Sequence, residues 1–196
     1  MKRQIAVFTL VLLAAAATVA QQQPKPAVGD HVPISKILDN QVRLIEGEFV
    51  PAADAMPEDK YSFAPTNGEF KGVRTFAQQI THVAATNWMA AGAILGEKPP
   101  VDIGEGENGP SNLKSKADIM KYLKDSFAYA HKAAASLTDQ NATEVIKAPF
   151  GGTGTRLSLA TIFAWHSFDH YGQMVEYLRT NGIVPPASRP REPQKK

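Results

Sequence analysis

The 196-residue chain carries 21 basic and 19 acidic residues, a formal net charge of +2, and 43% hydrophobic residues. Lys2 and Arg3 supply the positive excess, so the chain without its first twenty residues is formally neutral, which argues against a nucleic-acid-binding surface. The sequence contains no cysteine, and this excludes disulfides, covalent haem attachment and a cysteine nucleophile.

Residues 1–20 have the pattern of a secretory signal peptide. A basic start is followed by an apolar run from Ile5 to Val19, and small residues at Thr18-Val19-Ala20 offer a cleavage site. An uncleaved anchor helix is the alternative, but the run is short and rich in alanine for a membrane span. We therefore expect a periplasmic or secreted protein with no membrane attachment after cleavage.

The remainder is long enough for one self-sufficient core. We expect a flexible segment at 21–32, a helical domain at 33–184 and a disordered, proline-rich tail at 185–196.

The first two predicted helices follow in chain order. Apolar residues at helical spacing predict a helix from about Ile34 to Met56, bent near Pro51 and ended by Pro57. A second helix is predicted from about Phe70 to Leu95. A possible capping box at 66–69 precedes it, and Gly96 closes it.

Two further helices complete the predicted fold. A capping box at Ser115–Asp118 opens a helix that continues to about Leu137, and a last helix is predicted from about Leu157 to Thr180, stopped by Asn181-Gly182. The glycine-rich segment 149–154 between them lacks the Lys-Ser/Thr of a phosphate-binding P-loop. No segment has a convincing strand pattern, so the fold class is all-α, a four-helix bundle.

The most informative motif is the pair His166 and His170, four residues apart on the last predicted helix. Side chains at i and i+4 share a helix face, so both rings can approach one divalent ion. Their face also carries apolar residues and Gln173, whose amide is placed to orient a ligand ring. Three neutral histidines with an open fourth position are typical of a catalytic zinc-type site.

The third ligand is less certain from periodicity. His82 lies on the second predicted helix, nearly opposite its main apolar stripe and grouped with Thr86 and Met89. Either that helix is buried on two sides, so that His82 faces a cleft, or another residue completes the site. His131 is the first substitute, and His31 in the N-terminal segment is a weaker one.

A second apolar stripe on the last helix includes Phe168, and Trp165 lies nearby. This stripe predicts either a homodimer contact or burial against the first helix. Asp169 and Tyr171 flank the histidines but point away from them, so neither is assigned as a catalytic base, and the catalytic residues remain unknown. The metalloprotease motif H-E-x-x-H is absent, and no histidine has a glutamate three residues ahead of it, as a ferritin-like di-iron site requires.

Across nearly the whole chain after residue 20, the pattern resembles the DinB family of four-helix-bundle metalloproteins, also called DinB/YfiT-like. The resemblance rests on four features: Met56-Pro57 after the first helix, Tyr61–Thr66 with Glu69, His82 within Gln79–Val83, and His166-x-x-x-His170-Tyr171-Gly172-Gln173. It implies that His82, His166 and His170 bind one divalent metal ion, which is zinc, nickel or iron in that family.

The resemblance also implies a range of functions. Family members include enzymes that transfer groups to, or isomerise, small molecules with a low-molecular-weight thiol. We therefore expect a metal-dependent enzyme acting on a small-molecule substrate, in the manner of a thiol S-transferase. The signal peptide departs from the mostly cytosolic family, and such thiols are scarcer outside the cytosol. The alternative is a periplasmic metal- or ligand-binding protein without turnover.

Overall fold

The computed structural model of the chain describes residues 26–105 and 108–190. The predicted signal peptide lies outside these residues. The chain divides into two units, Met1–His31 and Val32–Lys196, and all the elements below belong to the second. Among the described residues, no helix has the length and apolar character needed to cross a membrane.

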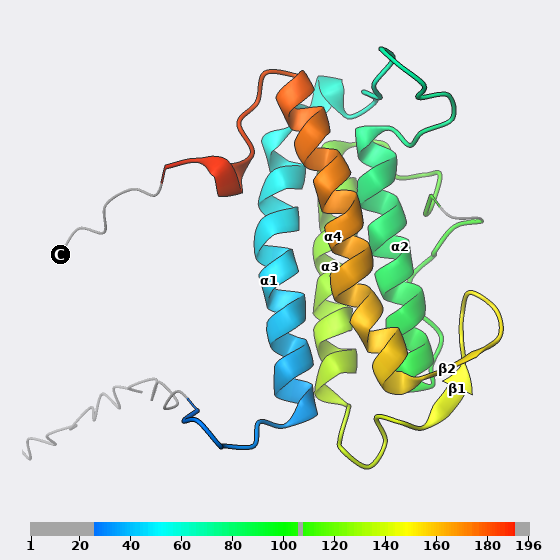
Figure 1. Cartoon of the computed structure of the whole chain (residues 1–196). Helices are drawn as coiled ribbons and strands as arrows, with labels where there is room; N and C mark the ends of the chain where they lie inside the picture. The colour runs from blue at the N-terminus through cyan, green and yellow to red at the C-terminus, as the bar shows by residue number, and fades with distance from the viewer. Residues whose placement is uncertain (1–25, 106–107, 191–196) are drawn as a thin grey trace, which may run out of the picture. The chain divides into compact units, whose positions relative to one another are not determined.

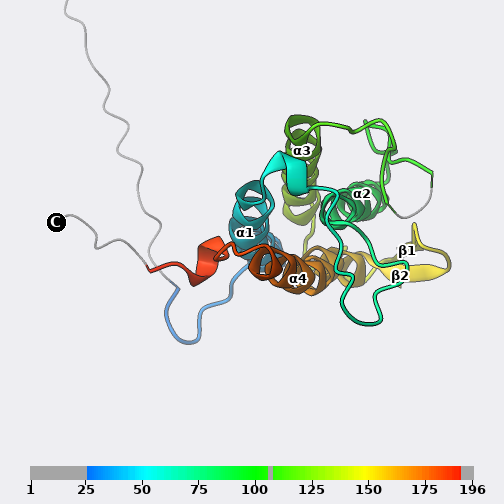
Figure 2. The same ribbon diagram turned by 90° about the horizontal axis from the view of Figure 1, so that it is seen from above.

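The described residues form four α-helices, α1 (Ile34–Ala55), α2 (Phe76–Leu95), α3 (Lys116–Ala135) and α4 (Arg156–Thr180). They pack as a four-helix bundle, which confirms the predicted fold class (Figure 1). Viewed along the bundle, α1 and α2 lie diagonally, and each packs against both α3 and α4 (Figure 2). Helices α1 and α4 run one way and α2 and α3 the other, so the connection from α2 to α3 returns along the bundle.

The start of α2 differs from the prediction. The helix begins at Phe76, because the true capping box is Thr75 with Gln78. The Gln78 amide donates to the Thr75 hydroxyl at 3.2 Å, and the Thr75 amide donates to the Gln78 side chain at 2.9 Å. This reciprocal pair satisfies two amides that a helix start leaves unpaired. The predicted start at Phe70 is therefore six residues early.

Other helix ends agree with those predicted from the sequence. Ser115 caps α3 by accepting a hydrogen bond from the Asp118 amide at 3.1 Å. Helix α4 ends at Thr180, and Gly182 adopts a left-handed conformation with φ of 74°. A short 3₁₀ helix, η1, covers Glu58–Lys60 after the end of α1.

Two short strands correct the expectation of a strand-free fold. β1 (Val145–Lys147) and β2 (Thr153–Thr155) form an antiparallel hairpin in which Val145 pairs with Thr155. Three-residue strands are too short to leave an alternating pattern in the sequence. The glycine-rich segment between helices α3 and α4 therefore forms the end of this hairpin.

The C-terminal segment also differs from the expected disordered tail. Among the residues described beyond Pro185, Pro186–Ser188 form a 3₁₀ turn, η2, that packs against α1. The remainder of the predicted tail, 191–196, lies outside the described residues.

Helix α2 is the most deeply enclosed part of the bundle. Fourteen of its twenty residues are buried, so it is covered on more than one side. Ile80 and Val83 are fully buried in the main core, and Gln79 and Thr81 on other faces are also buried. The two-sided burial allows a residue opposite the main apolar stripe, such as His82, to face a neighbouring helix.

Candidate metal centre

Helices α2 and α4 bring three imidazole rings to one point. The Nε2 atom of His166 lies 3.1 Å from Nε2 of His82 and 3.2 Å from Nε2 of His170. The potential ligand atoms of these residues all lie within 4.8 Å of one another. Of the two arrangements left open by the sequence, the structure adopts the one in which His82 faces its partners on α4.

The nitrogen separations suit a shared ion. Nitrogens about 2.0–2.1 Å from a zinc-sized ion are separated by about 3.3–3.4 Å in tetrahedral geometry and about 2.8–3.0 Å on an octahedral face. The observed 3.1 and 3.2 Å fall between these limits. Hydrogen bonding does not account for both contacts, because Nε2 of His166 can share a proton with only one neighbour at a time. The donor set therefore fits a divalent cation.

A chain of side-chain hydrogen bonds fixes the proton on His170. The Asp169 carboxylate accepts from Nε2 of Gln173 at 3.2 Å, and Oε1 of Gln173 accepts from Nε2 of Gln79 at 2.9 Å. Oε1 of Gln79 then contacts Nδ1 of His170. An ionised carboxylate can only accept, so it sets the direction of both amides and places the ring proton on Nδ1. The Nε2 lone pair of His170 consequently points toward the other two histidines.

Burial keeps the α4 histidines neutral. Desolvation, reinforced by the neighbouring His166 and His82 rings, lowers the pKa of His170 to about 3. Desolvation and the nearby His82 ring lower the pKa of His166 to about 4. Because only the neutral imidazole offers a lone pair to a metal, both side chains are in the binding-competent form at neutral pH.

A cavity of about 750 Å³ lies beside the three histidines. His82 and His166 form part of its wall, while His170 is buried, with 5% of its surface exposed. Thr86 and Met89, grouped with His82 by helical periodicity, also line this cavity. Its volume is within the usual range for a small-molecule site, roughly 300–1,000 Å³.

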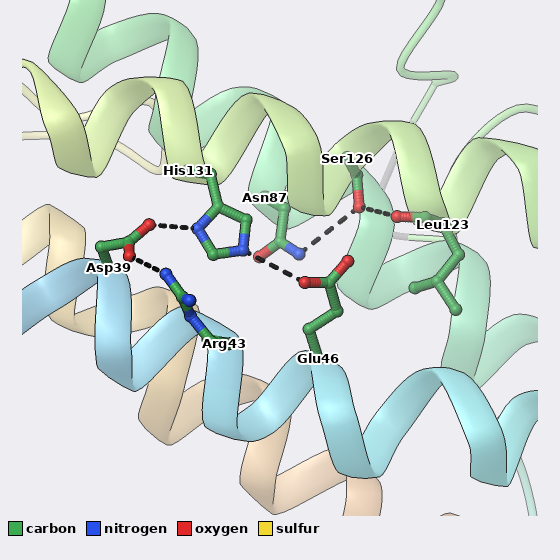
Figure 3. Close-up of polar contacts among 7 residues, drawn as sticks. All are labelled: Asp39, Arg43, Glu46, Asn87, Leu123, Ser126 and His131. Atoms are coloured by element: carbon green, nitrogen blue, oxygen red, sulfur yellow. Dashed lines mark hydrogen bonds and ion pairs between the residues drawn. The ribbon is translucent and has the colours of Figure 1, made fainter. Parts of the chain in front are cut away.

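The substitute ligand His131 belongs to a different cluster, shown in Figure 3. Its Nδ1 lies 2.6 Å from Oδ1 of Asp39 and its Nε2 lies 3.1 Å from Oε2 of Glu46. Asp39 also pairs with Arg43. His131 therefore links α3 to α1 and is not needed to complete the three-histidine site. The weaker substitute, His31, is likewise absent from the three-histidine group.

Neither Asp169 nor Tyr171 is among the described residues that line the cavity. Asp169 contacts Gln173, and the Tyr171 hydroxyl donates to Oε2 of Glu48 on α1 at 2.8 Å. Burial and the bond to Glu48 raise the pKa of Tyr171 to about 12.

Phe168, on the second apolar stripe of α4, is 43% exposed, so its burial against α1 is not observed. A homodimer contact through this stripe stays a prediction.

Two contributors to the site were not predicted from the sequence. Gln79, rather than Gln173, is the amide that contacts the His170 ring, and no pattern within α2 alone indicates this contact. Phe150 lines the cavity from the hairpin, and nothing in its local sequence indicates that position.

Fold and site together define a helical-bundle protein with an open three-histidine centre. The sequence matches the DinB superfamily over residues 41–174, and the chain belongs to that superfamily. No curated protein matches the sequence significantly.

Two solved structures share the fold. A DinB-like protein from Bacillus cereus is 17% identical, with a TM-score of 0.59 over 79% of this chain and 96% of that one. YfiT from Bacillus subtilis is 15% identical, with a TM-score of 0.57 over 82% of this chain and 95% of that one. YfiT is described as a probable metal-dependent hydrolase with an unusual four-helix bundle topology. At these identities the likeness establishes the fold alone.

Proposed function

We propose that the protein is an exported enzyme that holds one zinc, nickel or iron ion through His82, His166 and His170 and acts on a small molecule. The observation that carries this proposal is the convergence of three Nε2 atoms beside a cavity of about 750 Å³. When bound, such an ion supplies Lewis acidity, which generates a nucleophile from water or a thiol near neutral pH.

The chain's own residues support the reaction in three ways. Gln79 holds the His170 ring in one orientation and one tautomer. Burial keeps the α4 histidines in their neutral form. The cavity leaves room for a small molecule next to His82 and His166.

Two reaction types are the first to test. In S-transfer, a thiol gives its proton to solvent water, its sulfur bonds to an electrophilic carbon of the substrate, and the leaving group departs with the electron pair of its bond to that carbon. The resemblance to DinB-family enzymes motivates this reaction. Hydrolysis is the second candidate, and the shared fold with YfiT, described as a probable metal-dependent hydrolase, motivates it. The signal-peptide pattern of residues 1–20 supports export.

Metal binding is tested by titrating the purified protein with zinc and nickel against a chromophoric chelator. We expect one ion per chain in the wild type and in His131→Ala, and a large loss of affinity in His82→Ala, His166→Ala and His170→Ala. The loaded proteins are then assayed with small thiols plus electrophiles and with chromogenic esters. Turnover that disappears in His170→Ala supports the enzyme. Tight metal binding without turnover across the panel supports a non-catalytic binding protein instead.

A further inference from the structure

The cavity beside the histidines exposes two aromatic side chains. Trp165 on α4 is 59% exposed and Phe150 on the hairpin is 51% exposed, and both line this cavity. The Trp165 ring also stands edge-on to the His166 ring, with centroids 5.8 Å apart. A ligand that covers large aromatic surfaces otherwise exposed to water beside a cavity is bound more favourably.

The hairpin holds Phe150 at the cavity. Gly151 and Gly152 have φ values of 102° and 71°, conformations that favour glycine, so the chain turns sharply after Phe150. The Ala148 amide bonds to the Gly152 carbonyl at 3.1 Å, which closes the turn.

The base of the hairpin is fixed to the bundle. The Arg156 side chain pairs with Glu144 at 2.9 Å and also donates to the Ile94 carbonyl near the end of α2. The Arg156 amide bonds to the Glu144 carbonyl at 3.1 Å. These contacts connect the hairpin to both helices that carry the histidines.

The cavity walls extend from the histidines along α2 and α4. His82, Thr86 and Met89 follow one another at i, i+4 and i+7 on α2, and therefore share one face. Ile162 lies one turn before His166 on α4. Figure 1 shows the hairpin at the end of the bundle toward which these residues lead. The cavity is thus polar at the histidines and mainly apolar beyond them.

The described cavity lining supplies no negative charge for a cationic ligand. It includes Arg74 and no carboxylate. Two exposed aromatic rings alone would suit a quaternary ammonium group. An ion at the histidines adds further positive charge, which opposes that ligand class.

We propose that the cavity is a subsite for an uncharged or anionic small molecule with an aromatic or similarly bulky apolar group. The polar end of the molecule lies at the three histidines, and its apolar group covers Trp165 and Phe150. This inference rests on the proposed function, because the ion supplies the polar end of the site. Trp165 and Phe150 are its specificity-determining residues.

The test uses two metal-binding probes of different size, acetohydroxamate and benzohydroxamate, on the zinc-loaded protein by isothermal titration. The phenyl group should make benzohydroxamate bind roughly 10- to 50-fold more tightly in the wild type. Trp165→Ala and Phe150→Ala should each reduce that preference by about fivefold or more, with acetohydroxamate binding unchanged within about twofold. Phe168→Ala removes an exposed aromatic ring on α4 outside the cavity and should leave both affinities unchanged.

Four results would overturn the assignment. Equal binding of both hydroxamates by zinc-loaded wild type would reject the apolar subsite while leaving the metal site intact. An equal effect of Phe168→Ala and Trp165→Ala would also reject it. Displacement of benzohydroxamate by phenyltrimethylammonium would show that the cavity selects cations. Failure of the wild type to take up zinc would reject the metal site, and with it the subsite that depends on the ion.

Discussion

Gln79 on α2 donates a hydrogen bond from Nε2 to Oε1 of Gln173 on α4 at 2.9 Å, although 94 residues separate them in sequence. This bond connects a surface carboxylate, Asp169, to the buried ring of His170. The orientation of the His170 ring therefore depends on side chains that do not themselves contact the metal position.

Gln79→Leu should weaken zinc binding by about 10- to 100-fold, because the His170 ring loses the acceptor that fixes its tautomer. Gln79→Glu keeps that acceptor and should bind zinc at least as tightly as the wild type. Competition with a chromophoric chelator measures both. Gln78→Leu is the matched control: it removes the α2 capping bond, so it should lower stability without changing zinc affinity. Similar zinc affinities in Gln79→Leu and wild type would contradict an orienting role.

The metal-free protein should lose stability as pH falls from about 6.5 to about 4. The folded-state pKa values of His166 and His170, about 4 and about 3, lie below the unfolded value of about 6.5. The unfolded state therefore binds more protons in this window, and protonation favours unfolding. The contribution is at most about 1.4 kcal/mol per pH unit for each histidine, and less where partial exposure screens the charge.

Urea unfolding of the metal-free protein between pH 7.5 and 4 measures this dependence. A variant carrying both His166→Asn and His170→Asn should show a smaller loss of unfolding free energy over the same range. Equal pH dependence in the two proteins would mean that other groups cause the acid sensitivity.

Metal loading should raise the melting temperature at pH 7.5. Binding to the folded state alone stabilises it by about 2.7 kcal/mol at a free metal concentration one hundred times Kd. For a chain of this length, that corresponds to roughly 5–10 °C. Thermal melts with and without zinc or nickel check this for the wild type and His166→Ala, in which the increase should be absent. A wild type indifferent to both metals would contradict the three-histidine metal site.

His131→Leu should lower the free energy of unfolding by about 1–2 kcal/mol, because Asp39 and Glu46 lose a partner that links α3 to α1. The same substitution should leave zinc affinity unchanged, since His131 lies outside the three-histidine group. Chemical denaturation and a zinc titration on one preparation separate the two effects. A loss of zinc affinity with unchanged stability would return His131 to consideration as a ligand.

The four helices could be predicted from sequence because their apolar spacing and several of their end signals are local. Ser115 and Gly182 define helix ends through contacts within a few residues. The start of α2 was misplaced because two segments carry capping residues, and only Thr75 has its partner Gln78 in reach. The two short strands could not be predicted, because the pairing of Val145 with Thr155 leaves no periodic pattern in the sequence.

The site could be predicted only in part. The i, i+4 spacing of His166 and His170 indicated that both side chains face the same way. The direction of the His82 side chain depended on how many neighbouring helices cover α2. The bond between Gln79 and Gln173 forms across two helices, so no pattern within either helix specifies it. Phe150 reaches the cavity through the hairpin geometry, which was itself missed.

The three histidines come from two helices, and 84 residues separate His82 from His166. A bound ion would therefore act as a reversible cross-link in a chain that has no cysteine. Closing a loop of this length with a covalent cross-link removes unfolded-state entropy worth about 4–5 kcal/mol. Since α2 and α4 are held to the same ion, the pair should separate only after metal release. Chelation would then control how fast the bundle opens.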